Sequence, residues 1–125
     1  MQKHSVLVID DNQIDVLIAT KFLEMSNLFS AIHVAQNGAD ALVALKNLSP
    51  DYVLLDINMP ILDGWEFLDA FDSLFNQTQN QPKIVMLTSS INIDDANRAV
   101  NHPSITEFLV KPINATKIEQ FIGNP

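Results

Sequence analysis

Residues 6–11 read Val-Leu-Val-Ile-Asp-Asp, an unbroken apolar run that ends in two adjacent carboxylates. Two further runs have the same form: residues 52–55 precede Asp56, and residues 84–87 precede Thr88. Unbroken runs rich in β-branched residues are typical of central strands in a parallel sheet, because helices cover both faces of such a sheet. The polar residues that follow these runs therefore mark the carboxyl ends of three buried strands.

The rest of the chain supplies two edge strands and five helices. Segments 31–35 and 105–109 mix polar with apolar residues, which is typical of strands at the edges of a sheet. Between the strands, apolar residues recur three and four positions apart, as on the buried face of a helix. The predicted buried stripes are Ile14, Leu17, Ile18, Phe22 and Met25; Ala41, Leu42, Leu45 and Leu48; Trp65, Phe67, Leu68, Phe71 and Leu74; Ala96, Ala99 and Val100; and Ile118, Phe121 and Ile122. This alternation predicts a doubly wound α/β domain, with a five-stranded parallel sheet in the order 2-1-3-4-5 flanked by five helices.

Length and composition limit the class of protein. The chain has 125 residues, no cysteine, 15 acidic and 7 basic side chains and a formal net charge of -8. We expect a single domain over residues 1–125, without a disulfide framework, a cysteine-ligated metal or a thiol nucleophile. The apolar run before Asp10 is too short for a signal peptide or a membrane span, so we expect a cytoplasmic protein. An acidic surface repels a phosphate backbone, which argues against direct binding of nucleic acid and favours a protein or a cation.

Chemistry is expected where the strands end. In a doubly wound sheet, ligands bind at the carboxyl ends of the strands, where the strand order reverses. Asp10, Asp11 and Asp56 converge there, and three carboxylates at short range repel one another unless protons or a cation relieve them. Mg²⁺ prefers such oxygen ligands and pairs with phosphoryl groups. With the positive charge of Lys111 and the hydroxyl of Thr88, the set fits phosphoryl transfer to a carboxylate nucleophile.

Each of these features also has a structural interpretation. The pair Asp10-Asp11 is of the kind that caps the amino end of a helix. A single aspartate at a strand end, a threonine in a loop or a lysine before proline is commonly structural or simply hydrated. The functional interpretation therefore depends on their coincidence at one edge of the sheet. His33 and His102 have no partner at metal-ligand spacing, so no histidine site is expected.

Four motifs together identify a family resemblance. Residues 8–12 (Val-Ile-Asp-Asp-Asn), 54–64, 86–89 and 108–112 (Phe-Leu-Val-Lys-Pro) resemble the receiver domains of bacterial two-component response regulators. The resemblance covers about residues 5–122, and the four motifs in this order and spacing are highly specific. The chain resembles a stand-alone receiver of the chemotaxis-regulator kind, or a receiver excised from a larger protein.

The resemblance implies a set of roles in phosphorylation. Asp56 is the implied phosphoacceptor, receiving its phosphoryl group from a sensor histidine kinase, a phosphotransfer protein or a small phosphodonor. Asp11 is implied to bind Mg²⁺ directly and Asp10 mainly through a metal-bound water, while Asp56 and the backbone carbonyl of Asn58 complete the metal ligands. Lys111 is implied to pair with a phosphoryl oxygen. The protein is then a phosphoacceptor that catalyses its own phosphorylation and dephosphorylation, rather than an enzyme with a separate substrate.

Further residues are implied to transmit the signal. Thr88 hydrogen-bonds the phosphoryl group, and Phe108 turns inward as the loop of Thr88 moves. Pro112 follows a cis peptide bond that aims the lysine into the site, and Gly64 has a structural role in the loop after the acceptor. Phe108 stands in place of tyrosine, a departure from the family that removes the hydroxyl, so switching here works by packing alone. The side chains of Ser90 and Asn58 are expected to flank the path of the hydrolytic water.

The resemblance also implies an output surface. It is formed by the helix around 96–100, the strand at 105–109 and the last helix, from about 114 to 122. Phosphorylation is expected to change how this surface binds an unidentified downstream protein, or a second copy of the chain in a phosphorylation-dependent homodimer.

Three alternatives belong to other functional classes. The first is a receiver-like module that binds partners constitutively and never turns over phosphate, although the complete set of site residues favours a working receiver. The second is an electron carrier of the flavodoxin type, which shares the topology but needs a hydroxyl- and glycine-rich loop where residues 10–13 are Asp-Asp-Asn-Gln. The third is a carboxylate-nucleophile phosphatase, which requires an aspartate where Asn12 stands.

Overall fold

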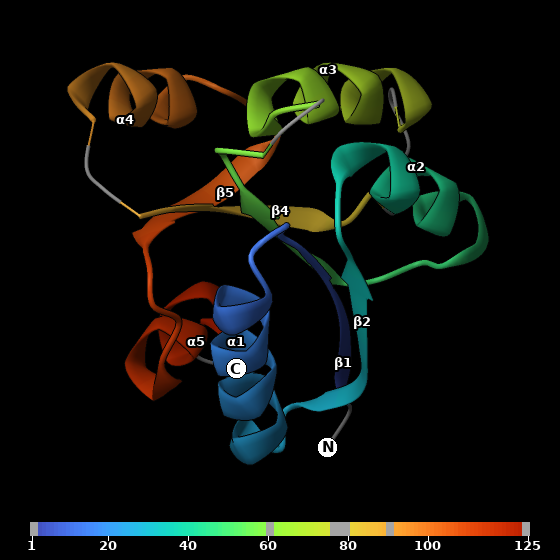
Figure 1. Ribbon diagram of the computed structural model, residues 1–125, viewed down its shortest axis with the longest axis vertical. Helices are drawn as coiled ribbons and strands as arrows, with labels where there is room; N and C mark the ends of the chain where they lie inside the picture. Colours follow the sequence, from blue (N-terminus) through green and yellow to red (C-terminus); the bar gives the residue numbers. More distant parts are fainter. Residues whose placement is uncertain (1–2, 60–61, 76–80, 90–91, 124–125) are drawn as a thin grey trace.

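The computed structural model describes residues 3–59, 62–75, 81–89 and 92–123. Within these ranges the chain forms one sheet of five parallel strands (Figure 1). The strands are β1 (His4–Ile9), β2 (Phe29–Ala35), β3 (Tyr52–Asp56), β4 (Lys83–Thr88) and β5 (Ile105–Val110), in the order β2-β1-β3-β4-β5. The predicted fold and both edge strands are confirmed. The expected role of Ser90 lies outside the described residues.

Five helices cover the two faces of the sheet. They are α1 (Gln13–Ser26), α2 (Gly38–Asn47), α3 (Gly64–Leu74), α4 (Ile93–Val100) and α5 (Ala115–Ile122). Figure 1 shows α1 and α5 on one side of the sheet and α2, α3 and α4 on the other. Among the described helices, none combines the length and the apolar character that crossing a bilayer requires.

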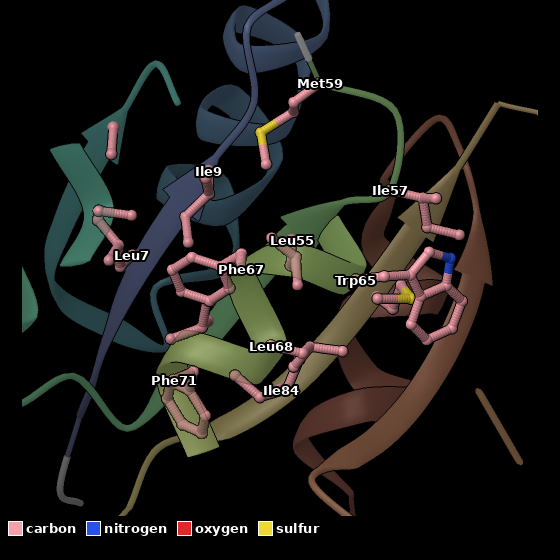
Figure 2. Packing of buried hydrophobic residues seen from close by; sticks show 14 of the residues in the cluster. Leu7, Ile9, Leu55, Ile57, Met59, Trp65, Phe67, Leu68, Phe71 and Ile84 are labelled. Atoms are coloured by element: carbon pink, nitrogen blue, oxygen red, sulfur yellow. The ribbon is translucent and has the colours of Figure 1, made fainter. Parts of the chain in front are cut away.

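Alternating strand residues divide the core into two layers. Leu7 and Ile9 of β1 face α2 and α3, and Figure 2 shows them in one cluster with Phe67 of α3. Val6 and Val8 face the opposite way, toward Leu23 of α1. Because successive strand side chains point to opposite faces, a strand covered on both sides must be apolar at every position. This requirement explains the unbroken apolar runs from which the sheet was predicted.

The buried side of α1 agrees with the prediction only in part, because Phe22 packs against the core whereas three other predicted residues do not. Ala19 and Leu23 face the core, whereas Ile14, Leu17 and Met25 are 69%, 58% and 74% exposed. The helix carries apolar residues on two sides, so spacing alone does not identify the side that the sheet covers. The same correction applies at the ends of α3 and α4, where the predicted core residues Leu74 and Val100 are 40% and 82% exposed.

Candidate functional site

Two buried carboxylates lie side by side at the carboxyl edge of the sheet. Asp10 follows β1 and Asp56 ends β3, and these strands pair directly, with Ile9 opposite Leu55. One carboxylate oxygen from each of Asp10, Asp11 and Asp56 lies within 4.8 Å of the other two. Asp10 and Asp56 are 3% and 4% exposed, whereas Asp11 is exposed to solvent. The predicted acidic cluster is therefore present, with one open side.

The loop after β1 leaves both of its carboxylates available to this cluster. The helix cap of α1 is Asn12, whose side-chain oxygen accepts hydrogen bonds from the backbone N–H groups of Ile14 and Asp15 at 3.0 Å. The interpretation of Asp10-Asp11 as the helix cap is therefore wrong. Asp10 instead accepts a hydrogen bond from the backbone N–H of Asn12 through Oδ1, at 2.9 Å. A neutral amide satisfies the helix end, and the charged groups remain at the sheet edge.

Lys111 reaches into the cluster from the end of β5. Its Nζ lies 2.7 Å from Asp10 Oδ2, 2.9 Å from Asp15 Oδ2 and 3.5 Å from Asp56 Oδ1, and its side chain is 11% exposed. The Lys111–Pro112 peptide bond is cis, as the family resemblance implies. Asp15 was not predicted as a site residue. Its position in the first helical turn after the acidic pair is the signal that could have identified it.

Strand β4 completes the edge next to Asp56. Asp56 is opposite Leu87 in the β3–β4 pairing, so Thr88 lies one residue beyond the partner of Asp56. Thr88 is 2% exposed, and its carbonyl accepts a hydrogen bond of 2.7 Å from the backbone N–H of Lys111. Phe108 of β5 is partly buried and packs against the core between the sheet and α2, α3 and α4.

The loop after β3 is held tightly under α3. The backbone N–H of Gly64 donates to the carbonyl of Ile57 at 2.8 Å, and that of Asn58 donates to Asp56 Oδ1 at 3.3 Å. A Cβ on Gly64 would stand 2.9 Å from the backbone oxygen of Asp56 and from Cα of Ile57. Glycine is required by this close approach of two backbone segments. The structural role expected of Gly64 therefore has a physical basis beside the site.

Burial and neighbouring charges both shift the pKa values of Asp56 and Lys111. Burial raises the pKa of Asp56 to about 6, assisted by the charge of Asp10 and opposed by Lys111. Burial also acts to lower the pKa of Lys111, but hydrogen bonds to Asp10 and Asp15 outweigh it and raise this pKa above its usual value. At neutral pH the site therefore combines an ionised nucleophilic carboxylate with a fixed ammonium group.

The donor set of the cluster fits a hard divalent cation. Its potential ligands are carboxylate oxygens from three residues, and it contains no sulfur or imidazole. Mg²⁺ binds through a few such oxygens and keeps several waters, which agrees with a cluster open on the side of Asp11. The arrangement can hold Mg²⁺ beside a carboxylate that is able to attack phosphorus.

Comparisons with known proteins identify the family to which the chain is similar. A family model described as the response regulator receiver domain matches residues 6–123. A two-component response regulator from Cytophaga hutchinsonii is 28% identical, with a TM-score of 0.90 over 97% of this chain and 96% of that one. The amino-terminal domain of a receiver protein from Methanoculleus marisnigri is also 28% identical, with a TM-score of 0.74 over 97% and 94% of the two chains.

Curated relatives are longer proteins. A protein-glutamate methylesterase/protein-glutamine glutaminase from Halalkalibacterium halodurans is 32% identical over 109 residues, which cover 86% of this chain and 30% of the relative. A protein of the same name from Bacillus licheniformis is 30% identical over 118 residues, covering 93% and 31%. The chain thus spans about a third of the length of the curated relatives that it matches.

Proposed function

The chain belongs to the family of response regulator receiver domains, and on this premise we propose that Asp56 is the phosphoacceptor of a signalling switch. The observation that carries the proposal is the position of Asp56: it is buried in an acidic cluster, with an ammonium group 3.5 Å from its carboxylate. Its pKa of about 6 leaves the carboxylate ionised, and hence nucleophilic, at neutral pH. In this proposal residues 1–125 act as a single receiver domain in the cytoplasm.

The proposed donor is a phosphohistidine of a sensor kinase or of a phosphotransfer protein. A carboxylate oxygen of Asp56 forms a bond to phosphorus while the bond from phosphorus to the imidazole nitrogen breaks, and the imidazole keeps the electron pair. The product is an acyl phosphate. Lys111 then pairs with a phosphoryl oxygen, and Thr88 donates a hydrogen bond to another. Water then forms a bond to phosphorus while the bond from phosphorus to the Asp56 oxygen breaks, which returns the carboxylate and releases inorganic phosphate. The chain thus catalyses both halves of its own cycle.

Mg²⁺ is the proposed cofactor. When bound, it neutralises charge on the phosphoryl oxygens during transfer. We assign direct ligation to the exposed Asp11, to Asp56 and to the carbonyl of Asn58. Both oxygens of Asp10 already accept hydrogen bonds, one from the N–H of Asn12 and one from Lys111, which supports an indirect role through water.

The surface of α4, β5 and α5 is the proposed output surface. Phe108 borders an open groove between α4 and β5, together with Val100 and Ile105. Ile93 and Val100 are exposed apolar residues on α4, at 74% and 82%. Apolar side chains left in solvent favour burial against a partner. We propose that phosphorylation changes the binding of a downstream protein here, or of a second copy of the chain.

The experiment is intact mass spectrometry after incubation with acetyl phosphate, with and without Mg²⁺. We expect a gain of one phosphoryl group that requires Mg²⁺ and is lost in Asp56→Asn. Asp69→Asn, which removes an exposed carboxylate of α3, is the matched control and should be phosphorylated like the unmodified protein. No gain while Mg²⁺ is bound would leave a constitutive binding module, and a gain that persists in Asp56→Asn would move the acceptor elsewhere.

A further inference from the structure

The carboxylate of Asp15 lies outside the acidic cluster but forms an ion pair with Lys111, the lysine that also contacts the cluster. Asp15 Oδ2 accepts a hydrogen bond from Lys111 Nζ at 2.9 Å, close to the 2.7 Å from Nζ to Asp10 and shorter than the 3.5 Å to Asp56. The ammonium group is thus hydrogen-bonded to Asp10 and Asp15, while its contact with the proposed acceptor Asp56 is the longest of the three. The side chain of Asp15 is 31% exposed and that of Lys111 is 11% exposed, so water screens this pair only in part.

Helix capping does not explain this contact. An acidic residue in the first turn is favourable for any helix, and α2 has the equivalent residue in Asp40, also three positions after an asparagine cap. The carboxylate of Asp40 accepts a hydrogen bond at 3.2 Å from the side chain of its own cap, Asn37. The carboxylate of Asp15 instead reaches a lysine 96 positions away in the chain. The two residues share their helical position and differ in what they contact.

We propose that Asp15 is a positioning residue that competes with the phosphoryl group for Lys111. This inference rests on the proposed function of Asp56 and Lys111. The ammonium group must leave Asp15 when it pairs with a phosphoryl oxygen, and the negative charge of Asp15 also repels the incoming group. Asp15 therefore weakens the phosphorylated state. In the resting state it draws Lys111 away from Asp56 and leaves the acidic cluster more open to a cation.

The inference predicts opposite effects on two ligands. In Asp15→Asn, Lys111 is shared between Asp10 and Asp56 alone, so Mg²⁺ added by itself should bind more weakly than in the unmodified protein. Beryllium fluoride, which mimics a phosphoryl group on a carboxylate, should bind more tightly at saturating Mg²⁺. We expect each affinity to change by about threefold, as suits a partly exposed ion pair. A purely structural effect on α1 would move both affinities in the same direction.

Isothermal titration calorimetry with Mg²⁺ and then with beryllium fluoride measures both effects. Asp15→Ala should behave like Asp15→Asn, whereas Asp15→Glu, which keeps the charge, should recover much of the original behaviour. Asp40→Asn controls for the loss of a first-turn carboxylate and should leave both affinities unchanged. Equal beryllium fluoride affinities in the unmodified protein and Asp15→Asn, or parallel changes for both ligands, would overturn this inference alone. Failure of the unmodified protein to bind beryllium fluoride would overturn the proposed function itself.

Discussion

At the scale of single residues, Asp56 connects the chemistry of the site with the stability of the fold. Its pKa in the folded protein is about 6, whereas a carboxyl group in an unfolded chain titrates near about 4. Between these two values the folded protein retains a proton that the unfolded chain has released. The contribution of Asp56 to stability therefore falls as the pH rises through this window. Above the window, the buried ionised carboxylate lowers the free energy of unfolding by a constant amount.

Asp56→Asn should remove the destabilising effect of the buried ionised carboxylate. In buffer with a metal chelator at about pH 8, we expect the variant to unfold about 3–8 °C higher than the unmodified protein, which corresponds to about 1–2 kcal/mol. At about pH 3.5 the difference should nearly vanish, because the carboxyl of Asp56 is then protonated in both the folded and the unfolded chain. Thermal unfolding followed by circular dichroism measures the difference in midpoint at each pH. Asp69→Asn should show no such pH dependence, and a less stable Asp56→Asn at the higher pH would contradict the assigned pKa.

At the scale of secondary-structure elements, α4 lies against β5 and is linked to α3 through the side chain of Trp65. The structure describes every residue of α4, and Ala99 is the only one of them that is buried. The indole N–H of Trp65 donates to Asp95 at 3.3 Å, and the guanidinium group of Arg98 lies 4.2 Å from the centre of the same ring. An element fixed by a few partly exposed contacts opens more readily than one anchored by a wide apolar face.

Arg98→Ala should loosen α4 without affecting the sheet. Loss of the cation–π contact, worth about 0.5–1 kcal/mol at such a site, should speed amide hydrogen exchange over 93–100 by about twofold to fivefold. The amides of β3 and β4 should exchange at unchanged rates. Lys83→Ala, which removes a cation 5.8 Å from the Tyr52 ring in another part of the fold, is the control and should leave α4 unaffected. Equal exchange of α4 in both variants would show that Trp65 does not hold it.

What the sequence predicts also depends on the element. The strands were predictable because a strand covered on both faces must be apolar throughout, and the acidic cluster followed because parallel strands end at one edge. The buried side of α1 was not predictable, because contacts with the sheet decide the orientation of the helix and the spacing of its apolar residues does not. Asp15 was missed for the same reason: a first-turn carboxylate is common in helices, and only the tertiary fold brings the start of α1 to Lys111, which follows β5.

At the scale of the whole molecule, the net charge of -8 is unevenly distributed. Asp10, Asp11 and Asp56 contribute three negative charges within a few ångströms, and Lys111 is the cation that the structure shows among them. Repulsion within the cluster opposes folding far more than the same charges dispersed over the surface, because Coulomb energy rises steeply at short range and low dielectric. Neutralising one of these charges should therefore stabilise the metal-free protein, whereas neutralising a distant one should not.

Asp11→Asn and Asp40→Asn test this distinction, because each changes the net charge by one but only Asp11 belongs to the cluster. In metal-free buffer we expect Asp11→Asn to raise the unfolding midpoint by about 1–4 °C and Asp40→Asn to leave it unchanged or lower it slightly. A Mg²⁺ concentration ten times its dissociation constant should stabilise the unmodified protein and Asp40→Asn by about 1.4 kcal/mol, and Asp11→Asn by much less. Sodium chloride of equal ionic strength separates specific binding from screening. A lower midpoint for Asp11→Asn without metal would contradict a strained acidic cluster, and an undiminished response to Mg²⁺ would remove Asp11 from the ligands.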